Sequence, residues 1–156
     1  MKGITKFSPS PQSIEANYGI VYTSWNEEIV NSLLENTKQE LLSLGVKENN
    51  ISVMEVPGAF EIPLAAKSLA SRVDVVITLG AIVKGDTPHF DFIASSCAQG
   101  IVQASLDKNK PIIFGVLTTN NEKQALERSD ANRENKGAEF ARSAMQIIEA
   151  LSNYND

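Results

Sequence analysis

The chain has 156 residues, a charged fraction of 21% and a net charge of −5, which suits one domain with a single hydrophobic core. The negative charge, without a dense Lys/Arg run, argues against nucleic-acid binding. One cysteine and one histidine exclude a disulfide framework and a four-ligand zinc site. We expect no membrane span and a cytoplasmic location, because no apolar run reaches spanning length and the N-terminus lacks a secretory h-region.

Strand and helix patterns alternate along the chain after a polar, proline-containing start. Residues 1–17 are expected to form a flexible arm, because "SPSP" opposes regular structure, and residues 18–156 to form one domain. The predicted elements are a strand at 18–25, a helix from an N-cap at Asn26 to a stop at Gly45, a strand at 51–56, a helix at 59–70, a strand at 73–83, a helix at 88–106, a strand at 111–117, a helix from a capping box at 119–122 to Ser129, and a final helix in "NKGAEFARSAMQIIEAL".

This alternation predicts an α/β fold, a three-layer αβα sandwich around a four-stranded parallel sheet with flavodoxin-like topology. The segment "VDVVITLGAIV" is apolar at nearly every position, as expected for a strand that is covered on both faces. In such folds, ligands bind beyond the carboxyl ends of the strands. The segments that follow the strands are therefore the candidate functional sites.

The segment "GAIVKGDTPH" combines a turn, a helix start and the only histidine. Gly85 permits a sharp turn, Asp86 or Thr87 suits the N-cap, and Pro88 suits the first helical position. The free amides of such a helix start fit a phosphate, and His89 in the first turn can exchange a proton near neutral pH. The same residues also suit a plain helix start with a half-buried histidine that is hydrogen-bonded to the backbone.

Aromatic and charged residues near the other strand ends each allow two interpretations. Phe60 and Glu61 in "VPGAFEIP" suit stacking on a planar ring and binding of hydroxyls, or a core phenylalanine and a glutamate favoured by the helix dipole. Trp25 suits a stacking platform or a core position. Phe114 lies in an apolar strand and is expected in the core unless an interface exposes it.

Two cations flank the polar stretch "SDANREN". Arg128, by its forked guanidinium, and Lys136 suit a phosphate, although such groups are more often solvated. Cys97 is expected to be buried and inert. Taken alone, the residues indicate an anion pocket with one candidate acid/base, no metal and no covalent nucleophile. These features do not identify the reaction that the protein catalyses.

Four motifs in order resemble one family, the 6,7-dimethyl-8-ribityllumazine synthases: "VPGAFEIP", "LGAIVKGDTPHFDFIA", "PIIFGVLTTNNEKQALERS" and "NKGAEFARSAM". The resemblance covers nearly the whole chain after about Tyr18. It implies a transferase that condenses 5-amino-6-(D-ribitylamino)uracil with 3,4-dihydroxy-2-butanone 4-phosphate to give the lumazine, phosphate and water. This is the penultimate step of riboflavin biosynthesis and uses no metal or organic cofactor.

The resemblance also implies site residues and an assembly. His89 matches the proton-transfer residue. The pyrimidine and ribityl chain would contact Trp25, Ala59, Phe60, Glu61, Ala81, Ile82, Val83 and, from a neighbouring subunit, Phe114. The butanone phosphate would contact Gly85, Asp86, Thr87, Arg128 and Lys136. The implied assembly is a homopentamer with active sites between subunits; a sixty-subunit icosahedral shell and a riboflavin synthase partner stay open, as does the effect of Lys84 where many members have arginine.

Two other classes of function compete with the enzyme. A flavin or nucleotide carrier would need a glycine-containing phosphate loop after the first strand, and "YTSWNEE" has no glycine. A catalytically silent scaffold would have no need of His89 and Arg128, which are both present.

Overall fold

The computed structural model describes residues 7–155, and its elements follow the expected alternation of strands and helices. In chain order they are α1 (Pro11–Ile14), β1 (Tyr18–Thr23), α2 (Glu27–Ser43), η1 (Glu48–Asn50), β2 (Ile51–Val56), η2 (Ala59–Glu61), α3 (Ile62–Ala70), β3 (Val75–Val83), α4 (His89–Lys108), β4 (Ile112–Thr119), α5 (Glu122–Ser129) and α6 (Lys136–Asn155). None of the helices in this part of the chain has the length and apolar character needed to cross a membrane.

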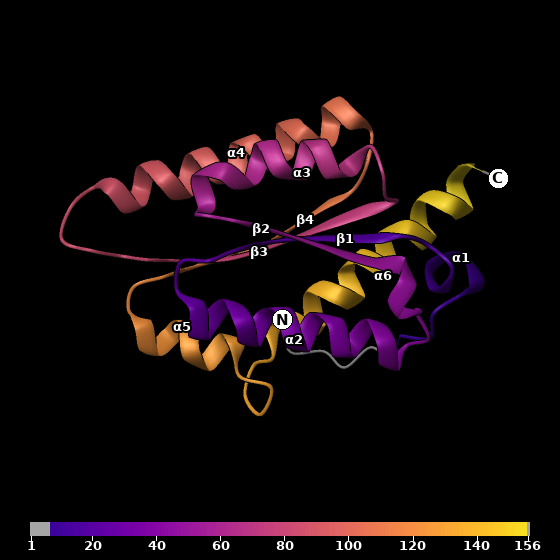
Figure 1. The fold of residues 1–156 in the computed structure, drawn as a ribbon, viewed down its shortest axis with the longest axis horizontal. Helices are drawn as coiled ribbons and strands as arrows, with labels where there is room; N and C mark the ends of the chain where they lie inside the picture. The colour runs from indigo at the N-terminus through magenta and orange to yellow at the C-terminus, as the bar shows by residue number, and fades with distance from the viewer. Residues whose placement is uncertain (1–6, 156) are drawn as a thin grey trace.

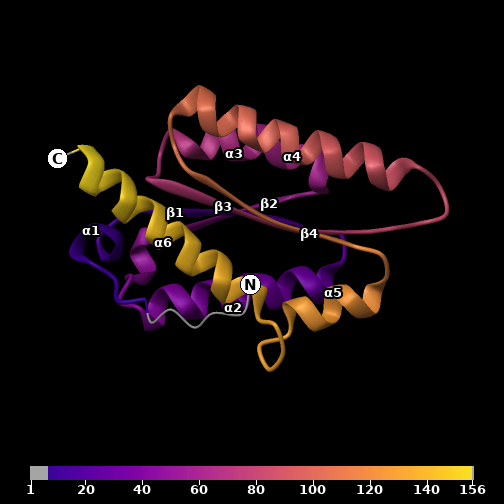
Figure 2. The same cartoon turned by 180° about the vertical axis from the view of Figure 1, so that it is seen from behind.

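The four strands form one parallel sheet in the order β2-β1-β3-β4. Helices α3 and α4 cover one face, whereas α2, α5 and α6 cover the other (Figures 1 and 2). The predicted three-layer sandwich is therefore confirmed. The central strand β3 is buried from Val75 to Ala81, which explains why its sequence is apolar without alternation.

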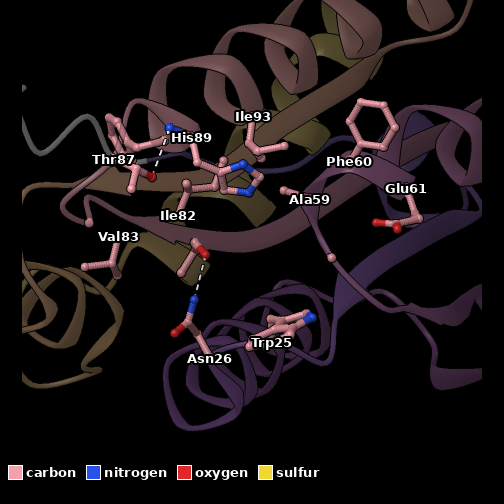
Figure 3. A pocket seen from close by; sticks show the side chains of 14 residues that line it. Trp25, Asn26, Ala59, Phe60, Glu61, Ile82, Val83, Thr87, His89 and Ile93 are labelled. Atoms are coloured by element: carbon pink, nitrogen blue, oxygen red, sulfur yellow. Dashed lines mark hydrogen bonds between the residues drawn. The ribbon is translucent and has the colours of Figure 1, made fainter.

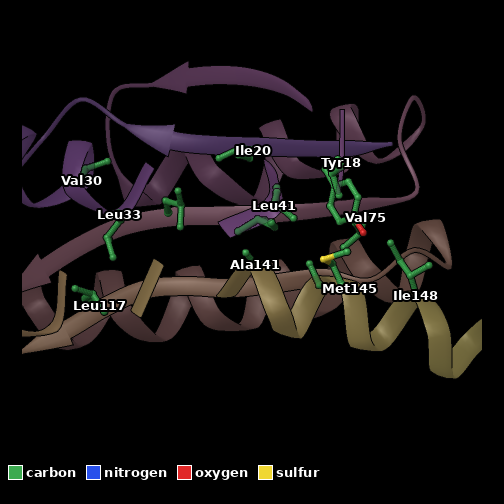
Figure 4. Close-up of a cluster of buried hydrophobic side chains, with 14 of the residues drawn as sticks. Tyr18, Ile20, Val30, Leu33, Leu41, Val75, Leu117, Ala141, Met145 and Ile148 are labelled. Carbon is green, nitrogen blue, oxygen red and sulfur yellow. The ribbon is translucent and has the colours of Figure 1, made fainter. Parts of the chain in front are cut away.

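The buried apolar side chains form one cluster on each face of the sheet. The larger cluster lies between the sheet and α2, α5 and α6 (Figure 4), and includes Tyr18, Ile20, Val30, Leu33, Leu41, Val75, Leu117, Ala141, Met145 and Ile148. The smaller one lies under α3 and α4 and includes Val21, Ile62, Ala66, Leu69, Val76, Cys97, Ile101 and Val116. Each fully buried leucine, isoleucine or valine contributes on the order of 2 kcal/mol to the free energy of folding.

The start of the described chain differs from the expected irregular arm. Pro11 begins the short helix α1, because proline fits the first helical position, where its missing N–H costs nothing. The amide of Ser10 and the hydroxyl of Ser13 both donate hydrogen bonds to the carboxylate of Glu149 in α6. The Tyr18 hydroxyl donates to the carbonyl of Ser13 at 2.6 Å. Residues 1–6 of the predicted arm lie outside the described residues.

The Glu149 carboxylate makes the attachment of this segment dependent on pH. Desolvation opposes ionisation of Glu149, but the hydrogen bonds from Ser10 and Ser13 outweigh it and hold the pKa of the carboxyl below its ordinary value. A lowered pKa gives stability that is present above the unfolded-state pKa of about 4.3 and is lost as the pH falls through the folded-state pKa.

Glu149→Gln is therefore expected to lower the free energy of unfolding at pH 7 by about 1 kcal/mol, since the carboxylate is only partly buried. The deficit should shrink at pH values below the folded-state pKa, where wild type carries a neutral carboxyl as well. Urea unfolding at both pH values measures this difference. Glu35→Gln, an exposed change on α2, is the control, and an equal deficit at both pH values would contradict the assignment.

Two predicted helix caps are corrected by the structure. Asn26 occupies the N-cap position of α2, but its side chain makes no capping hydrogen bond. Thr119 ends β4 and pairs with Val83, so the cap of α5 falls on Asn121, whose side chain accepts from the Gln124 amide at 2.9 Å. The stop after α2 is confirmed, because Gly45 has a φ of 105°, which glycine adopts without strain.

Strand β4 pairs with β3 in an unbroken parallel register, and the Thr78 side chain adds two contacts beside Phe114. The buried hydroxyl of Thr78 donates to the Ile113 carbonyl at 2.7 Å and accepts from the Gly115 amide at 3.3 Å. A Cβ on Gly115 would lie 2.2 Å from the Thr78 carbonyl oxygen. Phe114, between these two contacts, is 41% exposed, which corrects the expectation of a core phenylalanine.

Candidate active site

A cavity of about 690 Å³ opens at the carboxyl edge of the sheet, where the chain leaves β1, β2 and β3 (Figure 3). Helix α2 follows β1 on one face of the sheet and α4 follows β3 on the other, so the edge between β1 and β3 is the topological switch point of the sheet. The residues that line the cavity are Trp25, Asn26, Gly58, Ala59, Phe60, Glu61, Ala81, Ile82, Val83, Gly85, Thr87, His89, Phe90 and Ile93.

Trp25 forms one wall of the cavity and does not belong to the core. It is 72% exposed and lies just beyond β1, where the amide of Ser24 donates to Val56 and that of Trp25 to Pro57. A Cβ on Gly58 would lie 3.5 Å from the indole, so the ring lies close over the glycine backbone. This arrangement leaves an indole face available to a planar ligand.

Phe60 and Glu61 lie on the short helix η2, on another wall. Phe60 is 66% exposed, so the interpretation as a core phenylalanine was wrong. The Glu61 amide donates to the Gly58 carbonyl at 3.1 Å, which holds η2 against the turn after β2. The Glu61 carboxylate lies near the indole of Trp25, since a Cβ on Gly58 would be 3.4 Å from the carboxylate and 3.5 Å from the ring. Together with the phenyl ring of Phe60 on the same wall, these groups suit a ligand with a ring and hydroxyl groups.

Helix α4 brings His89 to the cavity. The helix begins at His89, one residue later than expected, with Pro88 in the N-cap position. The Thr87 hydroxyl accepts from the His89 amide at 3.4 Å. The His89 side chain is exposed, and its ring lies at the cavity near Ile93 and Ala59 (Figure 3). It forms no hydrogen bond to any other group in residues 7–155, so the interpretation as a half-buried, backbone-bonded histidine was wrong.

The start of α4, where the sequence predicted a phosphate site, lies at the cavity. The helix has 20 residues, and its first amides and the positive end of its dipole lie beside the cavity. Gly85 and Thr87 line the cavity, but Asp86 does not. Neither Asp86 nor Thr87 occupies the N-cap position, which corrects that expectation.

Phe114, Arg128 and Lys136 lie outside the cavity of their own chain. Arg128 lies in the last turn of α5, donates to the Gln124 carbonyl at 3.2 Å and lies 3.8 Å from the Glu134 carboxylate. Lys136 begins α6 and lies 3.0 Å from Glu139. No lysine or arginine is found among the fourteen described residues that line the cavity.

Four cavity residues were not predicted: Asn26, Gly58, Phe90 and Ile93. Ile93 follows His89 by four positions, so the two share one face of α4, and this spacing was a signal that the sequence offered. Gly58 lies between the predicted strand at 51–56 and the predicted helix at 59–70, and Asn26 was expected only as a cap. Their place in the cavity depends on where the strands end.

Residues of the motif "NKGAE" allow α2 and α6 to pack closely where the two helices cross. Asn135 has a φ of 45°, and its side chain accepts from the Ala138 amide at 3.3 Å. A Cβ on Gly137 would lie 2.7 Å from the Leu33 carbonyl oxygen, and the Gly137 carbonyl accepts from the Thr37 hydroxyl at 3.0 Å. The glycine is therefore needed for the close approach of the two helices.

The remaining reactive groups do not add chemistry to the cavity. Burial raises the pKa of the Cys97 thiol to about 11, so it is protonated at neutral pH and inert, as expected. Within residues 7–155, no group of His, Cys, Asp or Glu side chains could hold a metal ion. His89 and Glu61 are thus the titratable side chains on the cavity wall.

The sequence profile of the 6,7-dimethyl-8-ribityllumazine synthases matches residues 15–152, a span that contains every cavity residue. The chain is also similar to the 6,7-dimethyl-8-ribityllumazine synthase of Protochlamydia amoebophila (strain UWE25). The two are 47% identical over 137 residues, which cover 86% of this chain and 80% of that protein. With a parallel sheet, a cavity at its switch point and this similarity along nearly its whole length, the chain belongs to the 6,7-dimethyl-8-ribityllumazine synthase family.

Proposed function

We propose that the chain condenses 5-amino-6-(D-ribitylamino)uracil with 3,4-dihydroxy-2-butanone 4-phosphate to give 6,7-dimethyl-8-ribityllumazine, phosphate and water. The observation that carries this proposal is the composition of the cavity. An exposed indole, a phenyl ring, a carboxylate, the end of β3, a histidine and the start of α4 meet around one space. These groups match a planar pyrimidine with a polyhydroxylated chain on one side and a phosphate ester on the other.

The pyrimidine substrate is placed against Trp25 in this proposal. Its ring stacks on the exposed indole, and its polar edge meets the backbone at residues 81–83. The hydroxyls of its ribityl chain donate to the carboxylate of Glu61, beside Phe60. These contacts orient the amine for attack on the second substrate, and such orientation is a large part of catalysis when two substrates must react.

His89 moves protons in the proposed reaction. The primary amine of the pyrimidine attacks the ketone and gives an imine with loss of water. A proton then leaves carbon as phosphate departs, and the second amine attacks the remaining carbonyl and closes the ring with loss of a second water. His89 lies at the cavity with its ring free of hydrogen bonds to the described residues, so it can take up and return the protons of these steps.

The phosphate is proposed to lie at the start of α4, near Gly85 and Thr87. Its departure develops negative charge, which the helix amides stabilise. Since none of the described residues that line the cavity is a lysine or an arginine, we assign the complementary charge to Arg128 and Lys136 of a neighbouring subunit, and an aromatic contact from that subunit to Phe114. This assignment makes the active site a feature of two chains.

A homopentamer is the assembly that we propose. The outer sides of η2, α3 and α4 expose large apolar side chains, with Phe60, Leu64, Phe92, Val102 and Leu106 between 59% and 74% exposed. Such a surface is typical of a subunit interface. We also propose a cytoplasmic location, because the only cysteine is a free, buried thiol, as is usual in a reducing compartment.

The test is an assay with both substrates, in which lumazine absorbance is followed against an enzyme-free blank, because the reaction also proceeds slowly unaided. Wild type is expected to exceed the blank clearly. His89→Ala is expected to lower kcat on the order of 100-fold and still exceed the blank, since orientation and phosphate binding are retained. Gln39→Ala, an exposed change on α2, is the control.

Two outcomes would contradict this proposal. A wild-type rate equal to the blank would mean that the chain has the family's fold but lacks this activity, and would favour a carrier or a silent scaffold. A His89→Ala rate equal to that of wild type would remove the proton-transfer role of the histidine.

A further inference from the structure

Asn26 adopts a backbone conformation that few residues tolerate. Its φ of 57° and ψ of 50° lie in the left-handed region, which asparagine, aspartate and glycine adopt most readily. Its carbonyl accepts the first hydrogen bond of α2, from the Val30 amide at 3.0 Å. Its side chain makes no capping bond. The backbone conformation explains the presence of a small polar residue, but not the direction of its carboxamide.

The pairing of β1 and β3 explains that direction. The paired register ends at Tyr22 opposite Leu79, and its continuation would bring Ser24 opposite Ala81. The chain instead turns toward β2, since the amides of Ser24 and Trp25 donate to Val56 and Pro57. The Ala81 carbonyl thus lies beyond the end of the β1 ladder, in a residue that is only 7% exposed, where an unpaired carbonyl is costly.

The carboxamide of Asn26 takes the place of the missing ladder contact. Its Nδ2 donates to the Ala81 carbonyl at 2.8 Å, across the gap between the start of α2 and the end of β3 (Figure 3). Both residues line the cavity. A single side chain therefore joins the end of β3 to the segment that carries Trp25.

We propose that Asn26 is a positioning residue for the pyrimidine substrate. Its carboxamide fixes the backbone at residues 81–83, and its left-handed backbone directs Trp25 to the cavity wall. This role rests on the proposed function, because it assigns the pyrimidine to that wall. Loss of the carboxamide weakens binding of the pyrimidine and leaves binding of the butanone phosphate, at the start of α4, unchanged.

Two variants separate the carboxamide from the backbone conformation. Asn26→Gly keeps the left-handed backbone and removes the side chain. Asn26→Asp keeps the size and the left-handed tendency but places an acceptor against the Ala81 carbonyl. Matched controls are Asn109→Gly and Asn109→Asp, because Asn109 also lies in the left-handed region, with a φ of 50°, at the far end of α4.

Binding is measured without turnover by fluorescence of Trp25, the only tryptophan of the chain, during titration with 5-amino-6-(D-ribitylamino)uracil alone. KM for each substrate and urea unfolding complete the set. Both Asn26 variants are expected to raise the Kd and the KM of the uracil about 10-fold, with aspartate at least as severe as glycine. The KM of the butanone phosphate should change less than about 2-fold, and the Asn109 variants should bind like wild type.

The outcomes separate this inference from the proposed function. If wild type and both Asn26 variants bind the uracil equally well, the positioning role is overturned and the proposed function is not. An equal rise in KM for both substrates, or a loss of stability without a change in Kd, would reduce Asn26 to a structural residue and overturn it too. Wild type that does not bind the uracil would overturn the proposed function and, with it, this role.

Discussion

Arg128→Ala is expected to lower kcat on the order of 100- to 1,000-fold, the range seen when a group that stabilises developing negative charge is removed. The departing phosphate carries that charge, and the described residues that line the cavity of a single chain offer it helix amides but no cation. Lumazine formation at saturating concentrations of both substrates measures the effect. Arg133→Ala, which alters an exposed arginine of the neighbouring loop, is the control and should resemble wild type.

The chemistry of the side chain gives an intermediate variant. Arg128→Lys keeps the positive charge but loses the fork that binds two phosphate oxygens, so its rate should fall between those of wild type and Arg128→Ala. A rate of Arg128→Ala equal to that of Arg133→Ala would remove the guanidinium from the mechanism.

A mixing experiment tests whether Arg128 acts on the cavity of a neighbouring chain. His89→Ala and Arg128→Ala subunits are unfolded together, refolded and assembled. Where the two groups come from different chains, about a quarter of the sites regain an intact pair by random assembly, and activity rises above the mean of the separate variants. Activity equal to that mean would place both groups in one chain.

Gly115→Ala is expected to lower the free energy of unfolding by about 3 kcal/mol or more, as a severe case of overpacking. The added Cβ would lie 2.2 Å from the Thr78 carbonyl oxygen and 2.9 Å from the Phe140 ring. Strand β4 cannot move away from both contacts, because β3 lies on one side and α6 on the other. Relief therefore requires β3 and β4 to separate beside Phe114.

Urea unfolding at a fixed protein concentration measures this loss, because the apparent stability would depend on concentration in the proposed homopentamer. Gly85→Ala is the control for stability, since no atom lies within 4 Å of an added Cβ there. An equal decrease in the free energy of unfolding in the two variants would show that the close contact with Thr78 does not cause the destabilisation.

The element order was predictable because it depends on short-range patterns. Continuous apolar runs define β3 and β4, and helical spacing defines α2. The helix starts were less predictable, because capping depends on where neighbouring strands stop pairing. Asn26 before two glutamates has the pattern of a cap, yet its carboxamide is used by Ala81, 55 positions away in the sequence. Thr119 also has the pattern of a cap, yet it remains in β4 opposite Val83.

The candidate site, like the fold, could be predicted from the sequence only in part. Trp25, Glu61 and His89 meet in one cavity because the carboxyl ends of parallel strands lie at one edge of the sheet, which the element order alone implies. Phe114 and Arg128 lie elsewhere in the chain, and any meeting with the cavity depends on how whole surfaces pack between subunits. No local pattern contains that information. The substrate contacts assigned to these residues stay a prediction.

The stretch "NKGAE" has a consequence for how relatives of this chain should be interpreted. Asn135 and Gly137 are required by the crossing of two helices, so a descendant that has lost turnover but still folds would inherit them unchanged. Trp25, Phe60 and His89 are exposed and contribute little to the stability of a single chain. A distant relative that lacks these three residues but keeps "NKGAE" is therefore expected to retain the fold without the enzymatic activity.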